Sequence, residues 1–290
     1  YAVDPLLTVL LTASLLASVF VLQARSLRWG IVAGVALGLA IATKSTGLIY
    51  GMPVLLAWLL AYSPGGLRDF GSYLTWRQAL PGMFTTGAGV VVAFVVAQPY
   101  ALLDFQTFWA DVKAQADMAR GIVELPFTLQ YLETVPYLYH LRNLVVWGLG
   151  VPLGVVGVAG TLLFMVRGLR QYRSEELLIG TAILVPFLIL GGQQVKFMRY
   201  LLPLYPLLAL AAAVFLMRVG VGMSQAQSSI VRSIPPMLAL VILVPTLFYS
   251  LAFANIYSDR HPAFRMAEWV RANVPIGSFI AYESWDQGLP

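Results

Sequence analysis

The sequence predicts an all-α polytopic membrane protein with about eight transmembrane helices, an outer interfacial helix and the start of an extracytoplasmic α/β domain. Of its 290 residues, 59% are apolar and 11% are charged, against roughly 45–50% and 25% in average soluble proteins. Mean hydropathy is +0.80. A soluble domain of this size could not bury so much apolar surface. The composition therefore excludes a soluble enzyme, a disordered chain and a nucleic-acid-binding module.

Eight apolar segments are candidate membrane spans, because a helix needs about 20 mostly apolar residues to cross the hydrocarbon core. They are residues 5–23, 29–43, 48–62, 81–99, 143–166, 177–192, 200–217 and 235–255. Only four residues, beginning with Lys44, separate the second from the third. One helix over 29–62 would be about 51 Å long at 1.5 Å per residue, which exceeds the core of about 30 Å. A tight hairpin is therefore favoured over a single bent helix.

The distribution of charge orients these spans. With the N-terminus outside the cytoplasm, the inner loops carry nine arginines and three acidic residues, and the outer segments carry nine basic and ten acidic residues. The net positive charge then lies inside, as the positive-inside rule requires. Because the basic residues alone are equally divided, the rule favours this orientation weakly. We expect a multi-pass protein of the plasma (inner) membrane.

The first long outer segment, residues 100–142, contains a predicted interfacial helix. Phe105, Phe108, Trp109 and Val112 recur at helical spacing, and Asp104 precedes them as a candidate N-cap. An amphipathic helix of this kind lies in the membrane interface rather than crossing it. The prolines and tyrosines that follow indicate an ordered, non-helical stretch at headgroup level.

The second long outer segment is residues 257–290, which follow a transmembrane domain over 1–256. Residues 262–273 have the pattern of an amphipathic helix, and residues 278–282 alternate weakly as a strand does. Helix, turn and strand in this order indicate the start of a truncated extracytoplasmic domain.

Polar residues near the membrane interior are functional candidates, because a central Asp, Lys or Arg costs about 2.5–3.5 kcal/mol on insertion. In the predicted topology the candidates gather on the outer side. They are Asp4, Lys44, Asp104, Arg142, Lys196 and Arg199. An outer cleft with acids and cations suits transfer from a lipid-phosphate donor, since a carboxylate deprotonates the acceptor and cations stabilise the leaving phosphate.

Each candidate also has a purely structural interpretation. Lys44 either holds a lipid phosphate or extends to the headgroups as an interfacial lysine. Spacing alone favours Asp4 as the N-cap of the first helix over a role in the cleft. Lys196 and Arg199 either clamp a phosphate or, with Tyr200, anchor the interface.

The remaining candidates carry weaker signals. Asp104 is best explained as a helix cap, and His140 with Arg142 would either contact a sugar or anchor the fifth span. Glu283, Trp285 and Asp286 near the end of the chain could meet a sugar ring. The sequence has no cysteine and only two widely separated histidines, so it identifies no metal site or other cofactor and gives no support to a divalent metal.

Three segments resemble the bacterial protein-mannosyltransferase-like family of C-type glycosyltransferases. They read YAVDPLL at 1–7, GLAIATKSTG at 38–47 and RYLLPLYP at 199–206. The resemblance rests on the order and spacing of these three segments, and it covers essentially the whole chain. The family includes the dolichyl-phosphate-mannose protein mannosyltransferases and the aminoarabinose transferase of lipid A.

The resemblance implies an inverting transfer of a sugar from a polyprenyl-phosphate donor on the extracytoplasmic face. It implies that Lys44 approaches the lipid phosphate and that Asp4 belongs to the catalytic cleft. The family's main catalytic carboxylate usually lies in the first outer loop, so we expect the chain to be a fragment that lacks the first span and this loop. The expected partners are the lipid donor, membrane lipids and an unidentified protein, lipid or glycan acceptor, with no nucleic acid.

Two other functions compete with this hypothesis. A secondary transporter is disfavoured because the sequence has no paired interrupted spans and no ionisable residue at the middle of a span. A non-catalytic, lipid-binding membrane scaffold would keep the fold and lack the carboxylate of the first outer loop.

Overall fold

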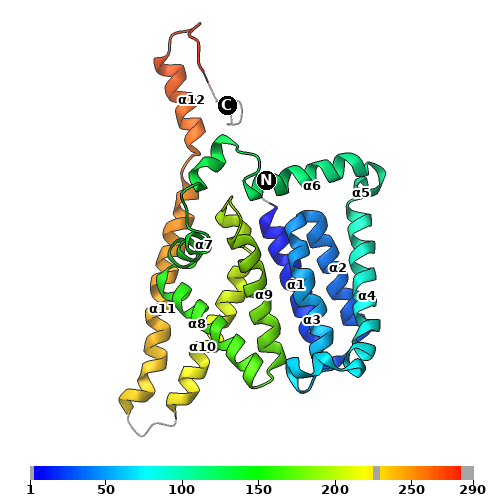
Figure 1. Cartoon of the computed structure of the whole chain (residues 1–290). Coiled ribbons are helices and arrows are strands. Elements are labelled where there is room, and N and C mark those ends of the chain that lie inside the picture. The colour runs from blue at the N-terminus through cyan, green and yellow to red at the C-terminus, as the bar shows by residue number, and fades with distance from the viewer. Residues whose placement is uncertain (1–2, 225–228, 282–290) are drawn as a thin grey trace.

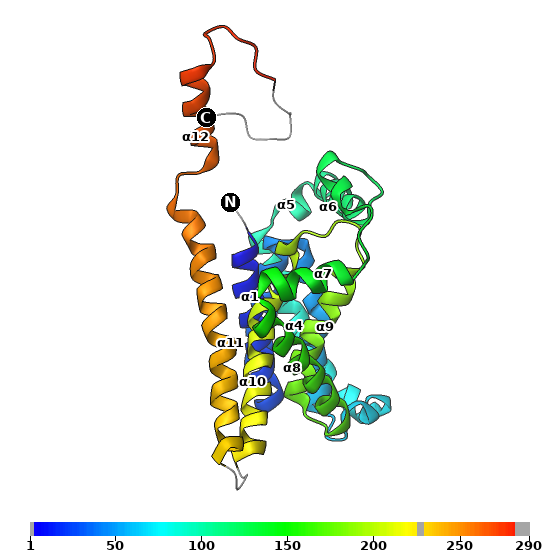
Figure 2. The same ribbon diagram turned by 90° about the vertical axis from the view of Figure 1, so that its left-hand side faces the viewer.

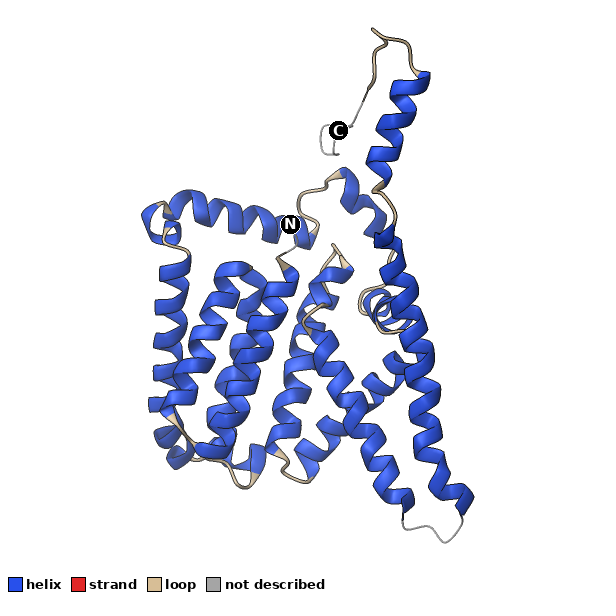
Figure 3. Ribbon diagram, turned by 180° about the vertical axis from the view of Figure 1, so that it is seen from behind, coloured by secondary structure: helices blue, strands red, loops and turns tan. Residues whose placement is uncertain are grey.

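The computed structural model describes residues 3–224 and 229–281, and of Ser224 and residues 229–232 only the backbone. This part of the chain consists of helices joined by loops and contains no strand (Figure 3). Eight helices form a bundle in which successive helices run in opposite directions (Figure 1). They are α1 (Asp4–Ala24), α2 (Leu27–Thr43), α3 (Gly51–Ala61), α4 (Tyr73–Ala97), α8 (Val151–Arg170), α9 (Ser174–Gly191), α10 (Leu204–Ser224) and α11 (Ser229–Asn255).

Each predicted span corresponds to one of these helices, which confirms the all-α polytopic membrane fold. Within the described residues, six helices are long and apolar enough to cross a membrane, whereas the segments Leu27–Thr43 and Ser45–Ala61 are shorter apolar helices. The second of these joins the 3₁₀-helix η1 (Ser45–Tyr50) to α3. Whether all eight segments cross the bilayer stays a prediction.

The chain forms the predicted hairpin at Lys44, whose extended backbone (φ −160°, ψ 129°) separates α2 from η1. Gly30 precedes Lys44 by 14 residues and Trp58 follows it by 14. The indole of Trp58 lies where a side chain at Gly30 would stand, and its Nε1 donates to the hydroxyl of Thr86 at 2.9 Å. Gly30 and Trp58 are equally far from Lys44 along the chain, so their contact requires the chain to reverse direction at Lys44.

Small residues bring the helices together in both halves of the bundle. A Cβ at Gly34 would collide with the backbone of Thr86, and one at Gly38 with the backbone of Val90, so α2 and α4 pack backbone against backbone. Gly160 of α8 faces the backbone of Ala211 on α10 in the same way. In a membrane, close contact of this kind supplies the packing that the hydrophobic effect does not.

After α4 and the short α5 (Tyr100–Leu103), helix α6 (Phe105–Arg120) lies across the ends of α1–α4 (Figure 1). Asp104 is its N-cap, as predicted, with Oδ1 accepting from the backbone N of Thr107 at 3.3 Å. Phe108 packs edge-to-face on Phe94 of α4. The backbone N of Val195 donates to the carbonyl of Ala119 at 3.1 Å. The helix is therefore fixed to the bundle at both ends, in the orientation expected of an interfacial helix.

The stretch after α6 is not the non-helical segment that the sequence predicted. It contains the 3₁₀-helix η3 (Pro126–Tyr131), α7 (Leu138–Asn143) and the π-helix η4 (Leu144–Gly148), which leads into α8. Its prolines begin or precede short helices instead of preventing them, because proline is tolerated in a first helical turn.

The predicted amphipathic helix after α11 is present. It is α12 (Pro262–Asn273), which follows the short 3₁₀-helix η6 (Ile256–Ser258) and projects beyond the bundle (Figure 2). Residues 278–281 form no strand, while residue 282 and the candidates Glu283, Trp285 and Asp286 lie outside the described residues. The extracytoplasmic α/β domain and its boundary therefore stay predictions.

Candidate functional site

The polar candidates of the sequence lie at one end of the bundle, as predicted. We call it the α6 end, since α6 lies across it (Figure 1). Helices α1 and α10 begin there, α2, α4, α9 and α11 end there, and α7 and the 3₁₀-helix η5 (Met198–Leu201) lie between them. These elements place Asp4, Lys44, Asp104, Arg142, Lys196 and Arg199 on the same side.

Lys44 and Asp4 form an ion pair at the α6 end. Lys44 Nζ donates to Asp4 Oδ1 at 2.6 Å, and the two side chains are 20% and 6% exposed. Asp4 is the first residue of α1 and makes no side-chain capping bond. The interpretation of Asp4 as an N-cap is therefore wrong, because its carboxylate is turned to the lysine of the neighbouring helix.

An aromatic ring supports the ammonium of Lys44 on a second side. Lys44 Nζ lies 4.3 Å from the ring centroid of Tyr200 in η5, within the range of a cation–π contact. Burial raises the pKa of the Tyr200 phenol above its ordinary value, and the charge of the nearby Arg199 guanidinium offsets only part of this rise. Arg199 itself is exposed and lies over the ring of Phe197. Two cations, one carboxylate and one phenol thus gather at this point.

Two pockets beneath α6 meet at Lys44, and together we call them the α6 groove. The pocket toward α9 has a volume of about 490 Å³, and the pocket toward α4 about 400 Å³. Both are lined by Lys44, Ser45, Leu48, Val112 and Gln115. The lysine therefore stands where the two halves of the groove join.

The two halves differ in chemistry. The half toward α4 has aromatic walls, formed by Phe94, Phe108 and Trp109, and its lining also includes the polar residues Gln98 and Asp111. The half toward α9 adds the amide of Gln193 and the hydroxyl of Thr46, with Tyr200 at its edge. A ligand with an apolar chain, a phosphate and a polar group would find a matching surface for each part.

Lys196 and His140 lie apart from this groove. Both side chains are 1% exposed, and Lys196 Nζ donates to the carbonyl of Gln194 at 3.0 Å. Neither ring nitrogen of His140 has a hydrogen-bond partner among the described residues. Burial lowers the pKa of His140 to about 4, helped by the charge of Lys196, and burial also lowers the pKa of Lys196. The phosphate-clamp hypothesis placed Lys196 at the donor phosphate with Lys44, but Lys196 does not line the α6 groove.

Two other candidates have separate positions. Asp104 caps α6, and Arg142 is exposed on α7 without lining either half of the groove. Sequence reasoning missed three groove residues, Asp111, Gln115 and Gln193. Gln115 continues the helical spacing of Phe108 and Val112, so the periodicity of α6 contained a signal for it.

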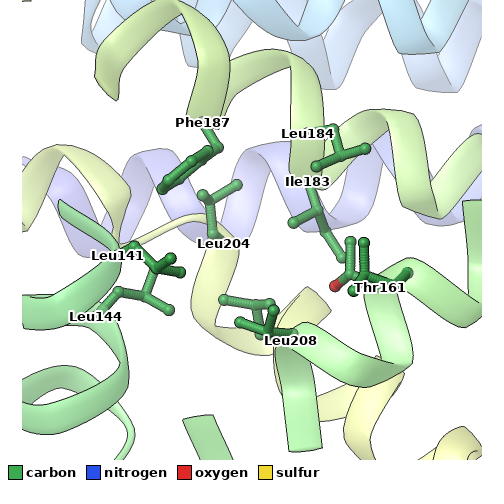
Figure 4. Close-up of a pocket in the computed structure, with 10 residues that line it drawn as sticks. Leu141, Leu144, Thr161, Ile183, Leu184, Phe187, Leu204 and Leu208 are labelled. Carbon is green, nitrogen blue, oxygen red and sulfur yellow. The ribbon is translucent and has the colours of Figure 1, made fainter. Parts of the chain in front are cut away.

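A further pocket of about 190 Å³ lies between α7, α8, α9 and α10 (Figure 4). Its walls are apolar except for Thr161, whose hydroxyl donates to the carbonyl of Gly157 at 2.9 Å. It therefore offers no group for acid–base chemistry. Within the described residues no three His, Asp or Glu side chains gather as metal ligands.

Comparison with known families gives two matches that divide the chain. Residues 1–102 match the family model of dolichyl-phosphate-mannose-protein mannosyltransferases, and residues 133–268 match that of the Alg9-like mannosyltransferase family. Both parts of the chain match mannosyltransferase families. The resemblance expected from the sequence is thereby confirmed.

The fold of this mannosyltransferase-like chain is similar to that of an oligosaccharyltransferase from Archaeoglobus fulgidus. The apo crystal structure is 15% identical, with a TM-score of 0.53, and the match covers 95% of this chain and 41% of the other. A complex of the oligosaccharyltransferase AglB, also from Archaeoglobus fulgidus, with an inhibitory peptide and a dolichol-phosphate is 17% identical, with a TM-score of 0.54 and the same coverage. The chain thus spans about two fifths of the length of these proteins. No curated protein matches it significantly.

Proposed function

We propose that the protein is a membrane glycosyltransferase that moves a sugar from a polyprenyl-phosphate-linked donor to an acceptor on the extracytoplasmic face of the plasma membrane, with inversion. The observation that carries this proposal is the position of Lys44, a partly buried cation held by Asp4 and Tyr200 at the junction of the α6 groove. The matches to two mannosyltransferase families support it.

Lys44 and Arg199 would hold the donor phosphate. An ammonium has three donors, and Lys44 uses one of them on Asp4, so two are left for phosphate oxygens. Arg199 is exposed beside Tyr200 and adds a second cation. Preorganised positive charge stabilises the negative charge that develops on the leaving group.

The two halves of the α6 groove would receive the two ends of the donor. The prenyl chain fits the half with Phe94, Phe108 and Trp109, and the sugar fits the half with Gln193 and Thr46. Lys44 between them then lies at the phosphate that joins sugar to lipid.

Transfer with inversion would proceed by direct displacement. The acceptor oxygen attacks the anomeric carbon, the bond from this carbon to the phosphate oxygen breaks, and the electron pair stays on the polyprenyl phosphate. Asp4 is engaged with Lys44, so we assign it the role of positioning that lysine. The acceptor proton needs another carboxylate, which the family resemblance assigns to the first outer loop.

A transfer assay with the full-length protein in liposomes tests the proposal. Lys44→Ala should lower transfer from a radiolabelled polyprenyl-phosphate sugar at least about 100-fold, as removal of a transition-state contact does. Because Lys44→Ala leaves Asp4 unpaired, Asp4→Asn/Lys44→Met serves as a second variant that removes both charges. Lys113→Ala, on the exposed side of α6, is the matched control. Transfer at the wild-type rate in folded Lys44 variants would contradict the assignment.

A further inference from the structure

A separate pocket of about 530 Å³ lies beside η5, and we call it the η5–α11 pocket. Helix η5 borders both sites. Its residue Tyr200 lines the α6 groove, whereas Met198 and Leu202, the residue that follows η5, line this pocket. The other walls come from η4, α8, α10 and the second half of α11. The proposed donor site does not use this space.

The polar lining of the η5–α11 pocket includes four hydroxyls and the indole of Trp147, and no acidic or basic side chain of the described residues lines it. Thr246 Oγ1 donates to the carbonyl of Ile242 at 2.7 Å, and Ser250 Oγ donates to the carbonyl of Thr246 at 2.8 Å. Tyr249 donates to the carbonyl of Trp147 at 2.6 Å. Because these protons are already used, the three oxygens can offer a ligand only acceptor lone pairs.

Such a lining selects the chemistry of the ligand. Acceptor oxygens need donors from the ligand. The described lining residues include no carboxylate to pair with an ammonium and no cation to pair with a phosphate, so either charged group would be buried at a cost. Neutral hydroxyl groups satisfy the acceptors without a charge to bury. Trp147 and Phe253 add exposed aromatic faces, which suit the apolar face of a sugar ring.

An irregular helix and a glycine form part of the wall of the η5–α11 pocket. One wall is the π-helix Leu144–Gly148, a rare element that is frequently found at functional sites. The bond from Tyr249 joins this π-helix to α11. The hydroxyl of Tyr205 lies against Gly148, where any Cβ would collide with it, so glycine leaves the room that this phenol occupies.

The setting of the pocket points to a lipid rather than a soluble sugar. Thr246, Ser250 and Phe253 belong to a candidate membrane span, and most of the lining is apolar. Leu247 and Leu251 are exposed on the same part of α11, where they would contact acyl chains. We propose that the η5–α11 pocket binds the neutral, polyhydroxyl headgroup of a membrane glycolipid.

Photocrosslinking tests this proposal with the full chain in phosphatidylcholine nanodiscs. The probe is a monoglucosyl diacylglycerol that carries a diazirine next to its headgroup. Labelled peptides should contain Trp147 or residues 246–253, and unlabelled monoglucosyl diacylglycerol should compete. Phosphatidylserine, which has a charged headgroup, and free glucose should not.

Two substitutions remove ligand contacts and conserve shape. Tyr205→Phe and Thr246→Val should each weaken labelling about threefold to tenfold, as expected for one lost hydrogen bond. Thr85→Val is the matched control, because Thr85 makes the same backbone bond, to the carbonyl of Pro81 at 2.7 Å, at an exposed position of α4. Unchanged melting temperatures show that the variants fold.

Three results would overturn the proposal. They are labelling that the Tyr205 and Thr246 variants leave unchanged, equal competition by phosphatidylserine, and competition by free glucose. None of them bears on the donor site, because the readout is lipid binding and not sugar transfer.

Discussion

The ammonium of Lys44 and the carboxylate of Asp4 lie 2.6 Å apart although 40 residues separate them in the chain. The pair joins the end of α2 to the start of α1 at the junction of the α6 groove. Both side chains are largely withdrawn from solvent, so each charge depends on the other for its stability. The ion pair with Asp4 therefore holds the ammonium of Lys44 in a fixed position at the α6 end.

Asp4→Asn should lower the free energy of unfolding by about 1–3 kcal/mol, because it leaves the ammonium of Lys44 without its partner. Lys44→Met should have a similar effect for the opposite reason. The double variant should recover most of the loss, since no unpaired charge is left. Unfolding in mixed micelles, analysed as a double-mutant cycle, measures this coupling. Strictly additive effects would mean that the pair does not form.

Gly34→Ala should destabilise the bundle by about 1–3 kcal/mol, as overpacking does. The new Cβ would meet the backbone of Thr86 and force α2 away from α4. Gly87→Ala is the control, because nothing lies within 4 Å of a Cβ there, and alanine favours a helix more than glycine does. Thermal unfolding in detergent distinguishes the two variants, and equal melting temperatures would contradict the close α2–α4 contact.

Glu176 joins three helices at the end of the bundle opposite α6. It accepts from Arg167 Nε at 2.7 Å and from Arg218 Nη2 at 3.3 Å. Glu176→Gln should lower the unfolding free energy by about 1–3 kcal/mol, because both arginines lose a charged acceptor. Glu175→Gln, at the exposed neighbouring position, should change it by less than about 0.5 kcal/mol. The opposite ranking of these two variants would exclude the network as a source of stability.

Stability should fall as the solution is acidified, because burial and Lys196 lower the pKa of His140 to about 4. The unfolded chain binds a proton near the ordinary pKa of about 6.5, while the folded chain keeps His140 neutral. Stability is therefore full above pH 6.5 and declines toward pH 4, by up to about 1.4 kcal/mol per pH unit. Melting temperatures from pH 4 to 8 measure this decline. His140→Phe should reduce it, and the same change at the exposed His261 should not.

Much of the architecture follows from local sequence. Apolar segments of sufficient length marked each helix of the bundle, and the helical spacing after Asp104 predicted both α6 and its cap. The common side of Asp4, Lys44 and Arg199 followed as well, because successive spans alternate in direction and so return polar ends to the same face. These features depend on the bilayer thickness and on residues a few positions apart.

Only the tertiary structure decided which side chains meet. The sequence allowed Lys196 and Arg199 to form either a phosphate clamp or an interface anchor. The fold buries Lys196 near His140 and leaves Lys44 at the groove with Asp4 and Tyr200. It also decided that hydroxyls from α10 and α11 share one pocket. Hydropathy fixes how far a helix extends, whereas its rotation and its neighbours depend on close packing between distant segments, which no local pattern encodes.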